Sequence, residues 1–385
     1  REGLSESHRM NKNWFKRRRT YVMGVPVLLF LTGSIFVNSS SEFGGTPNSM
    51  DKKKYEMSAN FSNGKFQNIL PTSMSMSAKD LATTLYDFVA GGDNLSPKSK
   101  IPVLHPDSAL IASPPKAARM VWFGHSAFLL QLDGKNILID PMFGAVPAPH
   151  PWLGRARFTE GLPIEIAALP KIDAILLSHD HYDHLDYGSI KALNAKTKEF
   201  YVPLGVGAHL RSWGIEESRI HELDWWNEVD HEGIRFALGP ARHFSGRALT
   251  DRFSTLWGSW VIHGKQDRIF FSGDSGYGPH FKEIGAKYGP FDFAMIECGQ
   301  YNEKWAEIHM MPEESAQAAV DVGTKAMMPI HWGSFVLAMH SWTDPVVRVT
   351  KQANALGMPI ITPRIGEVIS VDSLTGPSEA WWTDL

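Results

Sequence analysis

Strand-like apolar runs alternate with segments of helical character from about residue 120 to the end of the chain. A helix is expected at 312–322, because Pro312 suits the first helical position and Glu313 and Glu314 suit the first turn. Strands are predicted at 121–123, 126–132, 136–139, 172–177, 199–202, 234–239, 257–263, 268–272, 292–296, 325–330 and 367–371, and helices at 188–194, 204–212, 278–286, 312–322 and 345–356. This alternation predicts an α/β fold in which helices cover sheets.

The N-terminal part has a different pattern. A basic segment, residues 1–20, ends in Lys16–Arg19 and leads into 21–37, which is seventeen residues without a charge. This order is typical of a signal peptide or a short signal anchor, because a buried core helix is rarely preceded by four consecutive basic residues. We therefore expect residues 16–37 to export the body across a membrane or to anchor it there. In a bacterium the protein would be periplasmic or membrane-associated.

Composition divides the remaining chain. Residues 38–76 are rich in Ser, Asn, Gly and Lys and predict a linker. The segment from Ser77 to Ala90 suits a short amphipathic helix capped by Ser77. We expect residues 77–385 to form one domain with an N-terminal extension, since 43% hydrophobic and 21% charged residues are values of a globular protein.

Charge and cysteine content narrow the chemistry. The net charge is −3, and residues 1–20 carry +5 from seven Lys/Arg and two Asp/Glu, so the remainder carries −8. An acidic body is a poor electrostatic match to nucleic acid, and we expect no nucleic-acid partner. Cys298 is the single cysteine of the sequence, so a metal site must be built from His and carboxylates.

The strongest chemical signal is a His-x-His-x-Asp-His loop directly after the predicted strand 172–177. His179, His181, Asp183 and His184 lie within six residues, a spacing at which imidazoles and a carboxylate can share one or two ions. Exposed His and Asp are also common in loops without a metal. The residue types suit zinc, although manganese or iron would accept the same donors.

Further ligands are needed, and four candidates follow or flank predicted strands. His243 follows 234–239, Asp274 follows 268–272, and His331 follows 325–330, while His309 precedes the helix at 312. Taken singly, each is more simply explained as a surface or core residue. Their common location beside strand ends favours a shared site.

Several segments resemble the metallo-β-lactamase superfamily and, within it, the family of N-acylphosphatidylethanolamine-hydrolysing phospholipases D. The resemblance covers roughly residues 60–370. The segments that carry it are Trp122–Ser126, Ile139–Phe143, the loop from His179 to Asp186, Pro240–His243, Leu256–Trp260, Phe271–Tyr277, His309–Glu314 and Ile330–Phe335. It implies a four-layered αββα sandwich for the hydrolase domain, residues 77–385.

The resemblance also implies roles for individual residues. The first of two zinc ions would be held by His179, His181 and His243, the second by Asp183, His184 and His331, and Asp274 would bridge them.

The resemblance also implies roles for three further residues, two of which have a simpler structural explanation. Asp140 would orient a ligand imidazole, or it is a turn residue before Pro141. His309 would lie near the substrate phosphate. Asp186 continues the motif or caps a helix.

The implied activity is phospholipase D-type hydrolysis of N-acylphosphatidylethanolamine or a related phospholipid, by a hydroxide that bridges the metals. Asp183, Asp274 and His309 would be the catalytic residues, and His309 would contact the phosphate or protonate the leaving alkoxide. The substrate would be a phospholipid at a membrane surface. The resemblance is compatible with a homodimer, and the sequence leaves the oligomeric state open.

Other readings remain. A sugar-phosphate lactonase or another small-molecule hydrolase of the superfamily shares the metal loop. A nuclease is disfavoured by the acidic body and the export signal, and a non-catalytic scaffold by the full ligand set. For a lipid entrance, the apolar segments 145–153, 225–226 and 335–339 are candidates, although ordinary packing explains each equally well.

Overall fold

The computed structural model describes residues 32–37, 39–73, 79, 82–83, 86, 91–248, 250–374 and 379–385. Most of the expected export segment and most of the expected helix at 77–90 lie outside these residues. No helix among the described residues is long and apolar enough to cross a membrane. One compact unit extends from Gly44 to Leu385.

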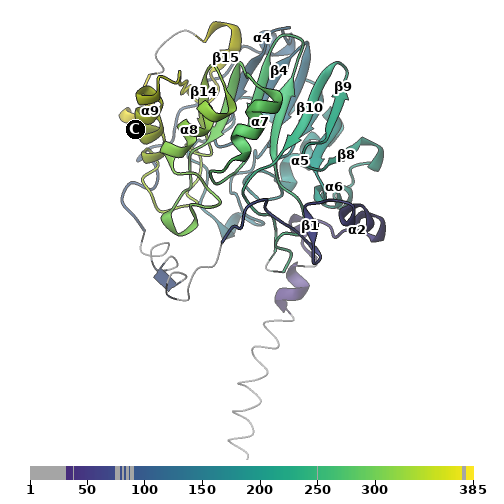
Figure 1. Ribbon diagram of the computed structural model, residues 1–385. Coiled ribbons are helices and arrows are strands. Elements are labelled where there is room, and N and C mark those ends of the chain that lie inside the picture. The colour runs from purple at the N-terminus through teal and green to yellow at the C-terminus, as the bar shows by residue number, and fades with distance from the viewer. Residues whose placement is uncertain are drawn as a thin grey trace, which may run out of the picture. The chain divides into compact units, whose positions relative to one another are not determined.

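A seven-stranded mixed sheet forms one half of this unit, in the order β15-β3-β4-β5-β6-β7-β8 (Figure 1). Its strands are β3 (Arg119–Trp122), β4 (Phe128–Leu132), β5 (Lys135–Ile139), β6 (Ile172–Leu176), β7 (Thr197–Pro203), β8 (Ile220–Leu223) and β15 (Val368–Ser370). The pairs from β5 to β8 are parallel. The loops after β5 and β6 therefore leave the sheet at the same edge.

A six-stranded sheet, in the order β14-β13-β12-β11-β10-β9, forms the other half. Its strands are β9 (Glu228–His231), β10 (Ile234–Gly239), β11 (Ser259–His263), β12 (Arg268–Phe271), β13 (Phe293–Glu297) and β14 (Met327–Ile330). The run from β12 to β14 is parallel. The residues that follow these three strands are thereby brought to one edge.

The two sheets pack face to face, and the alternation of side chains along each strand explains why. In β4, Phe128 and Leu130 belong to the cluster between the sheets, whereas Leu129 belongs to the cluster on the outer face. Helices cover both outer faces and give the predicted αββα arrangement (Figure 1). The helices are α2 (Ser49–Glu56), α4 (Ser108–Ala112), α5 (Tyr187–Leu193), α6 (Val206–Ser212), α7 (His280–Tyr288), α8 (Pro312–Val322) and α9 (Asp344–Leu356).

The expected linker over 38–76 differs from the structure from residue 44 on. This segment forms α2 and the short hairpin β1 (Phe61–Ser62) and β2 (Lys65–Phe66), within the main unit. Although the segment is mostly polar, it contains two aromatic residues that pack into the core, Tyr55 and Phe66, each only 1% exposed. Asn48 caps α2 and exchanges hydrogen bonds with Asp51, and this capping box stabilises the start of the short helix.

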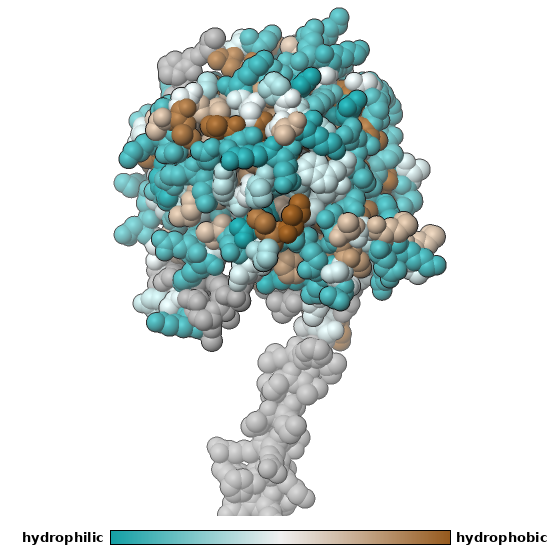
Figure 2. Space-filling view, in the orientation of Figure 1, coloured by the Kyte–Doolittle hydropathy of each residue, from teal (hydrophilic) through white to brown (hydrophobic). Residues whose placement is uncertain are grey.

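The sequence analysis also missed β8 and β9. Both strands mix charged and apolar residues, and six of their eight side chains are partly buried or exposed. On the face shown in Figure 2, the coloured residues are mostly hydrophilic, and hydrophobic residues form small separate patches. This face therefore offers no continuous apolar area to a partner.

Candidate metal centre

Loops from both sheets bring the predicted ligands together. The loop with His179, His181, Asp183 and His184 begins directly after β6. From the six-stranded sheet, His331 follows the last residue of β14 and Asp274 lies three residues beyond β12. The remaining ligand, His243, lies four residues beyond β10.

Three imidazoles converge in one group. His179 Nε2 lies 2.9 Å from His181 Nδ1, and His243 Nε2 lies 3.2 Å from the same nitrogen. Nitrogen ligands of one tetrahedral zinc ion lie roughly 3.3 Å apart. The spacing of these three nitrogens therefore suits a single small cation.

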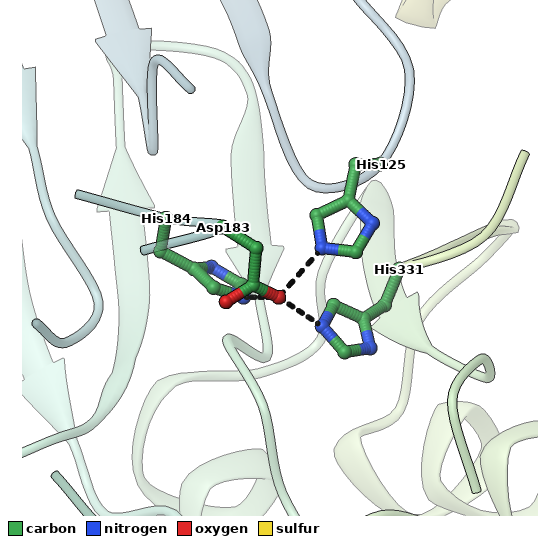
Figure 3. A group of neighbouring side chains, drawn as sticks. All are labelled: His125, Asp183, His184 and His331. Carbon is green, nitrogen blue, oxygen red and sulfur yellow. Dashed lines mark hydrogen bonds and ion pairs between the residues drawn. The ribbon is translucent and has the colours of Figure 1, made fainter. Parts of the chain in front are cut away.

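Asp183, His184 and His331 form a second group (Figure 3). Asp183 Oδ2 lies 3.1 Å from His331 Nε2 and 3.4 Å from His184 Nε2. All three are the residues that the family resemblance assigns to a second ion, and the structure places them together.

Asp274 connects the two groups through one oxygen atom. Its Oδ2 lies 3.2 Å from His184 Nε2 and 3.1 Å from His331 Nε2. The same oxygen lies 3.8 Å from both His179 Nε2 and His243 Nε2. Asp274 Oδ2 thus lies between the two groups, where a bridging ligand would be needed.

The residues fit a pair of divalent cations in chemistry as well as in spacing. Among the described residues, the buried atoms His184 Nε2 and Asp274 Oδ1 have no hydrogen-bond partner. Other ring nitrogens are fixed from behind, since His243 Nδ1 lies 3.0 Å from the Ile308 carbonyl oxygen. This leaves the Nε2 lone pair for the centre, as metal-ligating histidines require.

The electrostatic field of the cluster also favours cations. Burial lowers the pKa of His331, but Asp274 and the other carboxylates outweigh it and raise this pKa to about 10. Burial likewise opposes the charged form of His184, whose pKa Asp274 and Asp183 hold well above its usual range. Buried carboxylates that draw protons onto imidazoles would equally stabilise a bound metal ion.

Asp140 lies in a position that suits the orienting role. Its Oδ2 lies 2.7 Å from His184 Nδ1, and its Oδ1 accepts a 2.7 Å hydrogen bond from the Ser178 amide. The carboxylate therefore fixes the His184 ring and the start of the metal loop together. Asp186, by contrast, accepts a hydrogen bond from the Ser189 amide at the start of α5, which favours the helix-cap reading.

His309 lies beside the cluster and is held by a residue that the sequence analysis missed. Its Nδ1 contacts Glu297 Oε1, and its ring stacks on that of His331 at 5.3 Å. The carboxylate of Glu297 is fully buried and also accepts a 2.6 Å hydrogen bond from the Ser275 amide. Burial raises the pKa of Glu297. The sequence signal that could have identified Glu297 was its position at the end of a predicted strand.

His125 is the second residue that sequence reasoning left without a role. Its Nε2 lies 2.8 Å from Asp183 Oδ2, and its ring lies 4.2 Å from that of His331 (Figure 3). The clue was the turn Phe123-Gly-His-Ser126 after β3. His125 therefore orients Asp183, or adds a nitrogen to the second group.

A cavity of about 270 Å³ opens onto the metal centre. His181, Asp183, Asp274, His309 and His331 form its base, and Phe244, Arg252, Gln300, Lys304, Trp305, Ile308 and Leu337 form the rest of its lining. A larger hollow of about 700 Å³ lies near the C-terminus and has none of the candidate ligands in its lining. The smaller cavity is therefore the candidate substrate site.

The three segments expected to form a lipid entrance differ in their position relative to the cavity. Leu337, from 335–339, lines the cavity. Trp225 is a core residue whose Nε1 bonds the Trp257 carbonyl oxygen, and Trp152 is 71% exposed without lining the cavity.

Comparison with known proteins identifies the family. Residues 135–332 match the model of the beta-lactamase superfamily domain. The chain belongs to this superfamily. It is a metal-dependent hydrolase of the metallo-β-lactamase type, with a candidate His/Asp metal site.

Individual relatives extend the similarity beyond the domain. An uncharacterised protein of Mycobacterium tuberculosis is 40% identical over 334 residues, 85% of this chain and 88% of that protein. N-acyl-phosphatidylethanolamine-hydrolyzing phospholipase D 1 of Caenorhabditis elegans is 32% identical over 252 residues, 60% of this chain and 66% of the relative. Outer membrane protein RomA of Klebsiella pneumoniae is 56% identical over 94 residues, 24% of this chain and 70% of RomA.

A solved structure agrees with the fold. The isothiocyanate hydrolase from Delia radicum gut bacteria superposes with a TM-score of 0.53 at 20% identity, over 66% of this chain and 98% of that one. At this identity the likeness extends to the fold alone.

Proposed function

We propose that this protein hydrolyses a phospholipid by phospholipase D-type cleavage of its phosphodiester, with N-acylphosphatidylethanolamine as the first candidate substrate. The observation that carries the proposal is the double donor set joined by Asp274 Oδ2, with His309 beside it in one cavity. The relative in Caenorhabditis elegans, named for this activity, supports the lipid.

The donors suit two zinc ions, one at His179, His181 and His243 and one at Asp183, His184 and His331. Such ions, when bound, activate water as a nucleophile and stabilise negative charge on phosphoryl oxygens. Asp274 would be shared by both ions, and Asp140 would keep His184 in the orientation that presents Nε2 to the centre.

His309 is the chain's own candidate for proton transfer. Because Glu297 contacts Nδ1, the ring nitrogen left for the cavity is Nε2. In that position it would contact the phosphate or donate a proton to the departing alkoxide oxygen. Phe244, Trp305 and Leu337 would limit the access of bulk water to this step.

The expected location and partners also belong to this proposal. The name of the relative RomA supports a membrane-associated protein, in line with the predicted export segment at 16–37. A phospholipid at a membrane surface would be the substrate, a homodimer the assembly, and nucleic acid no partner.

The first experiment incubates the zinc-loaded protein with N-acylphosphatidylethanolamine, phosphatidylcholine, a sugar-phosphate lactone and bis-p-nitrophenyl phosphate, with and without a chelator. We expect metal-dependent release of phosphatidic acid and N-acylethanolamine. Turnover of the small diester alone would remove the lipid assignment, and turnover of the lactone alone would move the protein to the lactonases.

The matched variant is Asp183→Asn, which keeps the side-chain shape but removes a charged donor of the second group. Turnover should fall to nearly zero while the circular dichroism spectrum stays unchanged. Asp292→Asn, a change outside the cavity lining at a partly buried residue paired with Lys325, is the control. Undiminished turnover in Asp183→Asn would contradict a mechanism with two metals.

A further inference from the structure

Arg252 lines the substrate cavity without a carboxylate partner. Its guanidinium lies 4.6 Å from the centre of the Phe244 ring, and among the described residues it makes no hydrogen bond or ion pair. Arg252 is exposed at this cavity, and an arginine without a counter-charge beside a candidate substrate site is a candidate binder for an anionic group from outside the chain.

The neighbouring acid is engaged elsewhere. The Asp251 carboxylate accepts hydrogen bonds of 3.1 Å from the Arg247 amide and 2.8 Å from the Ala248 amide. The loop itself is fixed by the bond from the Phe253 amide to the Ser245 carbonyl oxygen. Asp251 therefore closes the turn and does not neutralise Arg252.

The position of Arg252 relative to the metal centre is set by one aromatic ring. The Phe244 ring packs edge-on against the His181 ring, with ring centres 4.4 Å apart. The Arg252 guanidinium lies 4.6 Å from the centre of the same Phe244 ring. An anion bound by Arg252 would therefore lie a short linker away from a phosphate at the metals.

A second cation lies in the lining of this cavity. Lys304 is part of the lining, and its Nζ lies 3.0 Å from Thr83 Oγ1. The same lining includes the carboxylates Asp183 and Asp274, which belong to the candidate donor set, so Arg252 and Lys304 are the cations left for a substrate anion. The volume of about 270 Å³ is below the range of about 300–1,000 Å³ that holds drug-sized ligands, which favours a head group over an acyl chain.

We propose that Arg252 binds a second anionic group, a carboxylate or a phosphate, in the head group of the substrate. The inference rests on the proposed phosphodiester hydrolysis and names as its preferred substrates phospholipids with a second anion in the head group, which N-acylphosphatidylethanolamine lacks. Arg252 would determine specificity through its planar, bidentate guanidinium, and Lys304 would add charge without comparable geometry.

The test uses two soluble substrates that differ only in charge, the p-nitrophenyl phosphodiesters of 3-hydroxypropanoate and of its methyl ester. With the zinc-loaded full chain, KM should be roughly tenfold to a hundredfold lower for the acid, as expected for a charge-assisted contact. Arg252→Ala should bring the KM ratio of the two substrates close to one. Arg252→Lys should keep part of the preference.

A matched control changes the same residue type outside the cavity. Arg235→Ala removes an exposed guanidinium whose partner is Glu228, and it should keep the wild-type preference. If Arg252→Ala lowered activity toward both substrates by the same factor, or if the wild type had no preference, the proposal would be overturned.

Two further arms separate other outcomes. If neither diester is hydrolysed, the proposed function fails, and calorimetry with the corresponding unreactive phosphonates decides the anion site by itself. Tighter binding of the anionic phosphonate that depends on Arg252 supports the site, and equal binding overturns it.

The second arm measures sedimentation of the protein with phosphatidylglycerol vesicles and with phosphatidylcholine vesicles. If Arg252→Ala weakens sedimentation with the phosphatidylglycerol vesicles but leaves the KM ratio of the soluble pair unchanged, Arg252 binds a membrane surface and the proposal is wrong.

Discussion

The two sheets supply the metal centre in different ways. The seven-stranded sheet contributes four candidate ligands from one short loop, His179 to His184. Its six-stranded counterpart contributes His243, Asp274 and His331, each from the end of a different strand. The first contribution is a local motif, whereas the second exists only when β10, β12 and β14 are in register.

Contacts between the two edges hold these contributions at a fixed separation. The His125 amide bonds the Trp332 carbonyl oxygen, and the His331 amide bonds the His125 carbonyl oxygen, both at 3.2 Å. Both histidines have a left-handed backbone, with φ of 56° and 67°. Strain of this kind is found where tertiary contacts prescribe the conformation, often at functional sites.

A glycine permits a close contact between the Asp274 loop and the loop after β6. A Cβ atom on Gly273 would lie 2.6 Å from the Gly258 carbonyl oxygen and 3.0 Å from Ser178 Cβ, and its φ is 58°. The Asp274 loop can therefore reach the β6 loop only with glycine at this position.

The largest expected effect comes from removing the residue that both groups share. Asp274→Asn should lower turnover about a thousandfold or more, because a single oxygen of Asp274 lies near both groups. Metal analysis of the purified variant should show loss from both positions, whereas Asp183→Asn should lose metal mainly from one. Equal, full metal content in both variants would contradict the shared position of Asp274.

Glu297→Gln tests the positioning of His309 by the six-stranded sheet. The carboxylate contacts His309 Nδ1 and the Ser275 amide, and a glutamine side chain has only one oxygen to accept from both. The rate should fall roughly tenfold to a hundredfold for an alkyl phosphodiester. A p-nitrophenyl ester should be much less affected, because its leaving group needs no proton. Equal losses on both substrates would indicate a general structural role instead.

Asp140→Asn tests the corresponding support in the seven-stranded sheet. The variant should weaken metal affinity roughly tenfold to a hundredfold, as measured by competition with a chromogenic chelator, because His184 loses its carboxylate partner. Asp372→Asn on the surface is the control. An unchanged affinity would show that the packing around His184 fixes the ring without Asp140.

The smallest effect concerns stability at the far end of β11, away from the metals. Burial first, and then Arg268 and Arg235, lowers the pKa of His263 to about 4. The unfolded chain therefore binds a proton below about pH 6.5 that the folded chain refuses, and stability should decrease between pH 6.5 and 4. His263→Phe should reduce this decrease by about 1–2 kcal/mol after discounting for solvent screening, measured by urea unfolding at both pH values. The same decrease in the variant would rule out His263 as its source.

The N-terminal segment shows where composition misleads. Residues 44–73 have the polar composition of a linker, yet Asn68 bonds the main chain of His243, with its Nδ2 2.8 Å from the carbonyl oxygen. The partner lies 175 positions along the chain. No local pattern reports such a contact, and two aromatic anchors in a polar segment do not raise its mean hydropathy enough to be noticed.

Local sequence patterns are sufficient to predict the α/β class, the main strands and helices, and the chemistry of the centre. Strands such as β4 are buried on both faces and so read as continuous apolar runs, and a His-x-His-x-Asp-His loop has few other uses. Both features are local, because each can be recognised within a short stretch of the sequence.

The packing of the two sheets determines which distant residues join the loop and which groups support them. His125 and Glu297 are single residues of common types, and each acquires its role because two sheet edges meet at Asp183 and His331. Arg252 likewise became a candidate only when its loop was seen beside the cavity with its neighbouring acid engaged. The physical reason is that strand register and sheet packing, which depend on the whole core, set these distances.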